Sequence, residues 1–121
     1  MNTSIPVLVV DDSQTMSLII SKSLQKLGFA DVDMAQDGQS ALDLLNEKQY
    51  GLILSDWEMQ PMSGDQFLKQ VRNKFNKIPV ILISATSSRG ASCLAGASAY
   101  LAKPFGDGDF ETAVKIALRK F

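Results

Sequence analysis

Acidic side chains follow two apolar runs of the chain, where they could act on oxygen or phosphorus. Asp11 and Asp12 come directly after Ile5–Val10, and Asp56 comes directly after 52–55. Carboxylates crowded together repel one another, and each is costly to bury without a partner. A hard divalent cation would relieve the repulsion, and Mg²⁺ prefers oxygen ligands. A carboxylate beside Mg²⁺ and a lysine can attack phosphorus and form an aspartyl phosphate.

A hydroxyl and an ammonium group stand at matching places further along the chain. Ser84 ends the apolar run that starts at Pro79, and Lys103 follows the short run 99–102. Both groups could stabilise the oxygens of a phosphoryl group in a transition state. Each residue also has a plainer interpretation, because aspartate and serine are common helix caps and lysine is common on surfaces.

Strands and helices must bring these side chains together. Short apolar runs alternate with amphipathic stretches, which indicates βα units around a parallel sheet in one doubly wound α/β domain. The helix in 86–95 should be short or frayed, and the last helix should run from near Asp109 to Lys120. The strands that we expect are 5–10, 32–35, 52–55, 79–84 and 99–102. Because ligands of such folds bind beyond the carboxyl ends of the strands, the five polar residues should converge there.

Composition excludes several classes of function. The chain has 121 residues, a net charge of −1, no histidine and a single cysteine, Cys93. Ser-His-Asp and Cys-His catalysis and the usual zinc sites are therefore excluded. No basic cluster favours direct nucleic-acid binding, and no apolar run is long enough to span a membrane. With one thiol and no signal-peptide pattern, we expect a cytoplasmic protein without membrane contact.

Three segments together resemble the receiver domains of two-component response regulators, in particular the stand-alone CheY-like type. They are residues 9–13, residues 54–57 with Gly64, and residues 96–105. The resemblance covers the whole chain, 1–121, as one receiver domain. It implies a five-stranded parallel sheet in the flavodoxin/CheY-like order 2-1-3-4-5, flanked by about five helices, the fourth short or irregular.

The resemblance implies a phosphoacceptor and a Mg²⁺ site. Asp56 would accept the phosphoryl group and ligate Mg²⁺. Asp12 would bind Mg²⁺ directly, and Asp11 would support it through water. The main-chain carbonyl of Glu58 would complete the ligands that the protein supplies.

The resemblance also implies how phosphorylation changes the shape of the domain. Ser84 would contact a phosphoryl oxygen, and Lys103 would pair with the phosphoryl group through a turn whose peptide bond to Pro104 is cis. Tyr100 would be the aromatic switch that moves inward as Ser84 moves toward the phosphate. Members usually have proline four residues after the phosphoacceptor, where this chain has Gln60.

The function implied is a signalling module rather than an enzyme acting on a free substrate. It would take the phosphoryl group from a histidine kinase or phosphotransfer protein, change shape, and control a protein target that the sequence does not identify. A shortened stretch between Ser84 and Lys103 keeps open a pseudo-receiver, which binds partners independently of phosphorylation. A flavodoxin or an aspartate phosphatase fits less well. Two carboxylates would repel a flavin phosphate, and Glu58 stands where such phosphatases have a second aspartate.

Overall fold

The structure is a computed structural model that describes residues 2–75, 77–85 and 96–119. Strands and helices alternate along most of the chain. Their order is β1 (Val7–Val10), α1 (Gln14–Lys26), β2 (Val32–Ala35), α2 (Gly38–Glu47), β3 (Leu52–Asp56), α3 (Gly64–Lys74), β4 (Val80–Ser84), β5 (Ala99–Ala102) and α5 (Asp107–Arg119).

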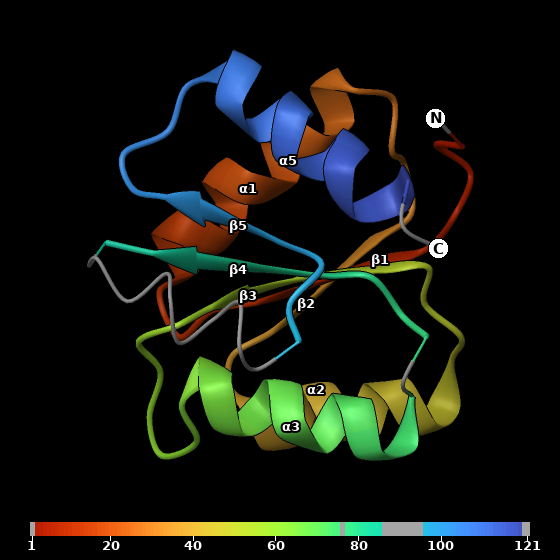
Figure 1. Cartoon of the computed structure of the whole chain (residues 1–121), viewed down its shortest axis with the longest axis vertical. Helices are drawn as coiled ribbons and strands as arrows, with labels where there is room; N and C mark the ends of the chain where they lie inside the picture. The colour runs from red at the N-terminus through yellow and green to blue at the C-terminus, as the bar shows by residue number, and fades with distance from the viewer. Residues whose placement is uncertain (1, 76, 86–95, 120–121) are drawn as a thin grey trace.

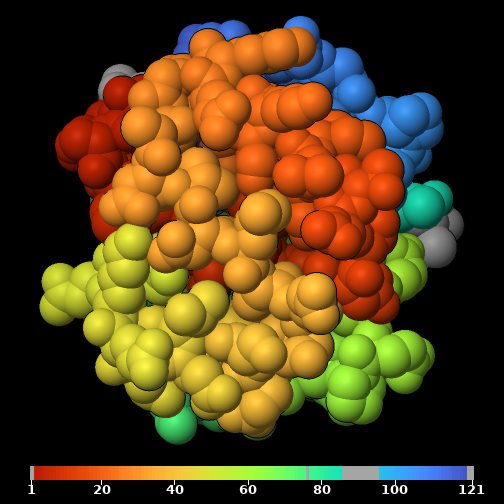
Figure 2. All heavy atoms as spheres, turned by 180° about the vertical axis from the view of Figure 1, so that it is seen from behind, coloured from red at the N-terminus to blue at the C-terminus, as the bar shows by residue number. Residues whose placement is uncertain are grey.

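The five strands form one parallel sheet in the order β2-β1-β3-β4-β5, as predicted. Figure 1 shows α1 and α5 on one face of the sheet and α2 and α3 on the other. The predicted short helix of 86–95 lies outside the described residues. Seen from behind, most of the visible surface comes from the first half of the chain, with α2 in yellow below the orange segment (Figure 2).

Strand side chains alternate between two apolar layers. Val7 and Val9 pack with α1 and α5, whereas Leu8 and Val10 pack with α2 and α3. All four side chains of β1 are fully buried. This explains why the run is continuously apolar, since a parallel strand covered on both faces has no solvent side.

Some strand and helix boundaries differ from the predictions, and β3 runs to Asp56 rather than 55 while β4 starts at Val80 rather than Pro79. The first strand starts at Val7 rather than Ile5, because Pro6 has no N–H to donate and Val7 N makes the first ladder bond, to Asp31 O at 2.8 Å. The last helix starts at Asp107, two residues before the predicted start. Acidic residues suit the first turn of a helix, where the backbone N–H groups carry partial positive charge.

None of the described helices is long and apolar enough to cross a membrane.

Candidate functional site

Strand register brings the predicted site residues to one end of the sheet. Val10 lies opposite Ser55, so the next residues of both strands, Asp11 and Asp56, are neighbours. On the other side of β3, Asp56 lies opposite Ile83, which precedes Ser84. Ser84 in turn lies opposite Ala102, and Lys103 comes next in the chain. Adjacent strands thus deliver the carboxylates, the hydroxyl and the ammonium group to a single edge.

Three carboxylates gather at this edge. Asp11, Asp12 and Asp56 each offer a carboxylate oxygen, and these oxygens lie within 4.8 Å of one another. Asp11 and Asp56 are buried, whereas Asp12 is exposed. The plainer interpretation of the acidic pair as helix caps is wrong, because Ser13 is the N-cap of α1 and accepts from Met16 N.

Lys103 provides the balancing positive charge. Its Nζ lies 3.1 Å from Asp56 Oδ1, and the Lys103 side chain is only 21% exposed. The main-chain N–H of Lys103 donates to Ser84 O at 2.9 Å, which fixes the backbone beside the last residue of β4. The peptide bond from Lys103 to Pro104 is cis, as the resemblance implied, and the bond from Gln60 to Pro61 is cis as well.

Ser84 makes a contact that the sequence did not indicate. Its hydroxyl donates to Glu58 Oε1 at 2.8 Å. The resemblance implies a role for the main-chain carbonyl of Glu58, and the residue also brings its carboxylate to the site. The sequence places Glu58 two residues after Asp56, which brings it near the site. It does not show in which direction the side chain points.

The electrostatics of the site favour holding a proton or a cation. Burial and then the charge of Asp11 raise the pKa of Asp56 to about 6, against the opposing effect of Lys103. Burial raises the pKa of Asp11, although that carboxylate accepts a hydrogen bond from Ser13 N at 2.8 Å. Burial opposes ionisation of Glu58. Its hydrogen bonds, of which the one from Ser84 is the strongest, outweigh burial and lower its pKa.

The donor set fits a magnesium ion. Among the described residues, Asp11 Oδ2 is buried and accepts no hydrogen bond, and such an orphaned oxygen indicates an unfilled ligand role. The cluster contains oxygen donors only, which suits Mg²⁺ rather than zinc or copper. Asp11, Asp12 and Asp56 could therefore hold the ion, with Mg²⁺ offsetting their mutual repulsion.

Gly64 lets α3 start against the end of β3, beside Asp56. A Cβ on Gly64 would overlap the carbonyl oxygen of Asp56 and lie 2.7 Å from Trp57 Cα. Gly64 N also donates to Trp57 O at 2.9 Å. Ser63 and Gln66 close the start of α3 with a capping box. These contacts hold the loop beside Asp56 in place.

Tyr100 lies on β5, two residues before the end of the strand, and is 36% exposed. It lines a hollow of about 330 Å³ between β5 and α5, together with Pro104 and Ile116. Tyr100 therefore forms part of a concave surface beside α5.

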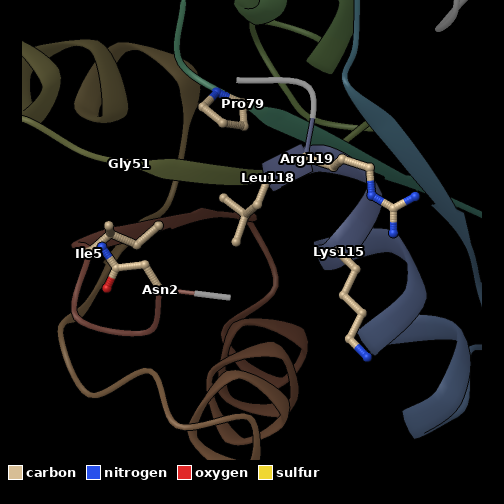
Figure 3. A pocket seen from close by; sticks show the side chains of 7 residues that line it. All are labelled: Asn2, Ile5, Gly51, Pro79, Lys115, Leu118 and Arg119. Carbon is tan, nitrogen blue, oxygen red and sulfur yellow. The ribbon is translucent and has the colours of Figure 1, made fainter.

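A larger hollow, of about 570 Å³, lies at the opposite end of the sheet. Figure 3 shows Ile5 and Leu118 on its apolar side and the cationic ends of Lys115 and Arg119 on α5. Gly51, also in its lining, precedes β3, whereas Asp56 ends that strand. This hollow is thus separate from the acidic site.

Comparisons with known proteins agree with this geometry. The family model described as the response regulator receiver domain matches residues 7–115. The chain is 34% identical over 110 residues to chemotaxis protein CheY-3 of Vibrio cholerae, covering 87% of this chain and 85% of that protein. It is 35% identical over 104 residues to chemotaxis protein CheY of Pseudomonas aeruginosa, covering 82% and 84%.

Solved structures give the same assignment. The chemotaxis response regulator CheY4 of Vibrio cholerae superposes with a TM-score of 0.87 at 29% identity, covering 96% of this chain and 100% of that one. FixJ-N superposes with a TM-score of 0.88 at 27% identity, covering 100% and 98%. The chain therefore belongs to the response regulator receiver domain family, the CheY-type signalling domains of two-component systems.

Proposed function

We propose that the protein accepts a phosphoryl group on Asp56 and changes shape in response. The observation that carries the proposal is the pairing of three carboxylates within 4.8 Å of one another with an ammonium group 3.1 Å from one of them. A purely structural acidic cluster has no need of a buried nucleophile aligned with a lysine. Nor does it need a hydroxyl at the neighbouring strand end.

Asp56 is suited to act as the nucleophile. A pKa of about 6 leaves its carboxylate ionised at neutral pH. One of its oxygens forms a bond to phosphorus while the bond from phosphorus to the donor's imidazole nitrogen breaks, and that nitrogen keeps the electron pair. The donor in this step is a histidine kinase or a phosphotransfer protein, which carries the phosphoryl group on a histidine.

Lys103 and Ser84 stabilise the transferred group. The ammonium group of Lys103 balances the negative charge that reaches Asp56, as positioned cations do in phosphoryl transfer. Ser84 donates its hydroxyl hydrogen to a phosphoryl oxygen once it leaves Glu58, which it contacts in the structure. Asp11, Asp12, Asp56 and the carbonyl of Glu58 would hold Mg²⁺, which when bound supplies further positive charge to the phosphoryl oxygens.

The response passes to the face that carries Tyr100. Removal of the Ser84 hydroxyl from Glu58 rearranges the end of β4, and β4 pairs directly with β5. The exposed ring of Tyr100 moves inward and reshapes the hollow that it lines with Ile116. A protein target that binds this face then distinguishes the phosphorylated form. The domain signals through this change and turns over no free substrate.

Phosphorylation with a small donor tests the proposal directly. Purified protein is treated with Mg²⁺ and acetyl phosphate, and intact mass and the fluorescence of Trp57 are followed. We expect one phosphoryl adduct, and Asp56→Asn should abolish it. Asp43→Asn, an exposed aspartate on α2, serves as the matched control and should keep the adduct. If the wild type gains no adduct, the protein is a pseudo-receiver, and binding partners should be sought without phosphate.

A further inference from the structure

One arginine of α3 holds the segment that enters β5. Arg72 Nη1 donates to Ile78 O at 2.8 Å, Nε donates to Gly96 O at 3.1 Å, and Nη2 donates to Ser98 Oγ at 3.4 Å. Helix α3, the loop before β4 and the segment before β5 therefore meet at a single guanidinium. The planar fork of arginine can serve several acceptors at once, which a lysine cannot.

The start of β5 is also tied to the start of β4. Ser98 is buried, its N–H donates to Val80 O at 2.8 Å, and its Oγ accepts from Val80 N at 3.1 Å. Gly96 has a φ of +95°, a left-handed conformation that favours glycine. The chain thus turns at Gly96 under the guanidinium and is fixed by Ser98 before the strand begins.

Apart from the ladder with β4, few described side chains specify the register of β5. It is an outer strand of four residues, and Leu101 is its only buried side chain. Register is set by the hydrophobic pattern, and in β5 that pattern consists of two side chains packed on the core, Ala99 and Leu101. A slip of one residue would move Lys103 by about 3.3 Å along the strand direction. The 3.1 Å contact of Lys103 Nζ with Asp56 Oδ1 depends on this register, because a shift of that size moves the backbone that carries the lysine.

We propose that Arg72 is a positioning residue of the phosphoacceptor site. Through Gly96 and Ser98 it fixes the register of β5, and with it the reach of Lys103 to Asp56. We call these contacts of Arg72 with Gly96 and Ser98 the Arg72 clamp. Its effect on phosphoryl transfer rests on the proposed function of Asp56, whereas its effect on the strand does not.

Hydrogen exchange tests the clamp without any phosphoryl group. Arg72→Met should speed exchange of the Ser98 and Lys103 amides by about tenfold, because these N–H groups bond to β4 and β5 is loosened. The amide of Val7, which bonds to Asp31 O at the far edge of the sheet, should not change. Lys69→Met is the matched control, since Lys69 lies on the same helix with a side chain that is 68% exposed.

Phosphorylation kinetics test the consequence for the site. Arg72→Met should slow transfer from acetyl phosphate by about tenfold or more, because small misplacements of a catalytic group are costly. The affinity for Mg²⁺, read from Trp57 fluorescence, should rise rather than fall, because its ligands follow β1 and β3 and Lys103 no longer lies beside Asp56. Arg72→Lys is a milder change that keeps the positive charge. Its rate of transfer from acetyl phosphate should still be lower than that of wild type. All rates are taken well below each variant's unfolding temperature.

The outcomes separate the clamp from the proposed function. Uniform loss of protection across the sheet in both arginine variants would mean that Arg72 only stabilises the fold, and it would overturn the proposal. Unchanged exchange at Ser98 and Lys103 would overturn it as well. If wild-type protein takes up no phosphoryl group, the proposed function fails, and the exchange data alone decide the role of Arg72 in placing Lys103.

Discussion

The hydroxyl of Ser84 donates to the carboxylate of Glu58, with 2.8 Å between Oγ and Oε1. The two residues come from neighbouring strand ends, and Glu58 stands two positions after Asp56. In this state the hydroxyl that would meet a phosphoryl oxygen is already engaged by a negatively charged neighbour. A phosphoryl donor approaching Asp56 must therefore displace that contact and overcome the repulsion of Glu58.

Removing the charge of Glu58 should speed phosphorylation. Glu58→Gln keeps an acceptor for Ser84 but removes one negative charge from the path of an anionic donor. We expect transfer from acetyl phosphate to quicken by roughly two- to tenfold, the size of a single nearby charge at a partly exposed site. Glu47→Gln removes an equal charge from an exposed position at the end of α2 and should leave the rate unchanged. A slower or unaltered rate in Glu58→Gln would contradict this account.

Ionisation of Asp56 should destabilise the metal-free fold. Its pKa is raised from 3.8 to about 6, so between these values the folded state binds more protons than the unfolded state. Stability from this group is therefore full below pH 4 and is lost as the pH rises through 6. In EDTA at pH 7.5, Asp56→Asn should be more stable than wild type by on the order of 1–3 kcal/mol.

Urea unfolding at several pH values checks this prediction. The stability gap between Asp56→Asn and wild type should narrow as the pH falls from 7.5 toward 4.5. Comparing the two proteins cancels the titration of carboxylates far from Asp56, such as Asp33, whose pKa the Tyr50 hydroxyl lowers. Mg²⁺ at pH 7.5 should also narrow the gap, because the ion stabilises wild type. A gap that is the same at every pH would count against a raised pKa at Asp56.

The apolar pattern of the sequence predicted most of the fold. The continuous run of β1 is fully buried, and the pattern alone indicated a strand covered on both faces. The order of the sheet and the residues gathered at its carboxyl edge came instead from the resemblance and from the rule for doubly wound folds. The start of α5 was missed by two residues, because Asp107 and Gly108 are poor helix formers by local propensity.

Contacts between side chains of distant segments were not predictable in the same way. The Glu58 carboxylate reaches Ser84 because the loop after β3 turns its side chain toward β4, and no periodicity encodes that direction. Arg72 has the helical spacing of an ordinary surface residue next to the buried Val71. Its three acceptors lie in segments that only the folded chain brings together.

Lys103 should support phosphoryl transfer while opposing metal binding. Lys103→Met removes the cation 3.1 Å from Asp56, so we expect transfer from acetyl phosphate to fall by about 10²-fold, as when one stabilising donor is lost. The affinity for Mg²⁺ should rise, because no ammonium group then competes for the carboxylates. Titration of Trp57 fluorescence with Mg²⁺ measures this second effect. Lys26→Met, in an ion pair that is mostly exposed, is the control. Weaker Mg²⁺ binding in Lys103→Met would contradict the prediction that Lys103 opposes metal binding.

Gly64 should tolerate no side chain, in contrast to Gly108. In Gly64→Ala the new Cβ would overlap the carbonyl oxygen of Asp56, so α3 and the end of β3 must move apart. Such overpacking costs about 1–3 kcal/mol of unfolding free energy, and we expect a matching loss in urea unfolding. Gly108→Ala places its Cβ where nothing lies within 4 Å and should leave stability equal or raise it by up to about 1 kcal/mol. Since Asp56 moves only in the first variant, only Gly64→Ala should also weaken the Mg²⁺-dependent change in Trp57 fluorescence. Equal stability of the two variants would show that the loop after β3 yields without strain.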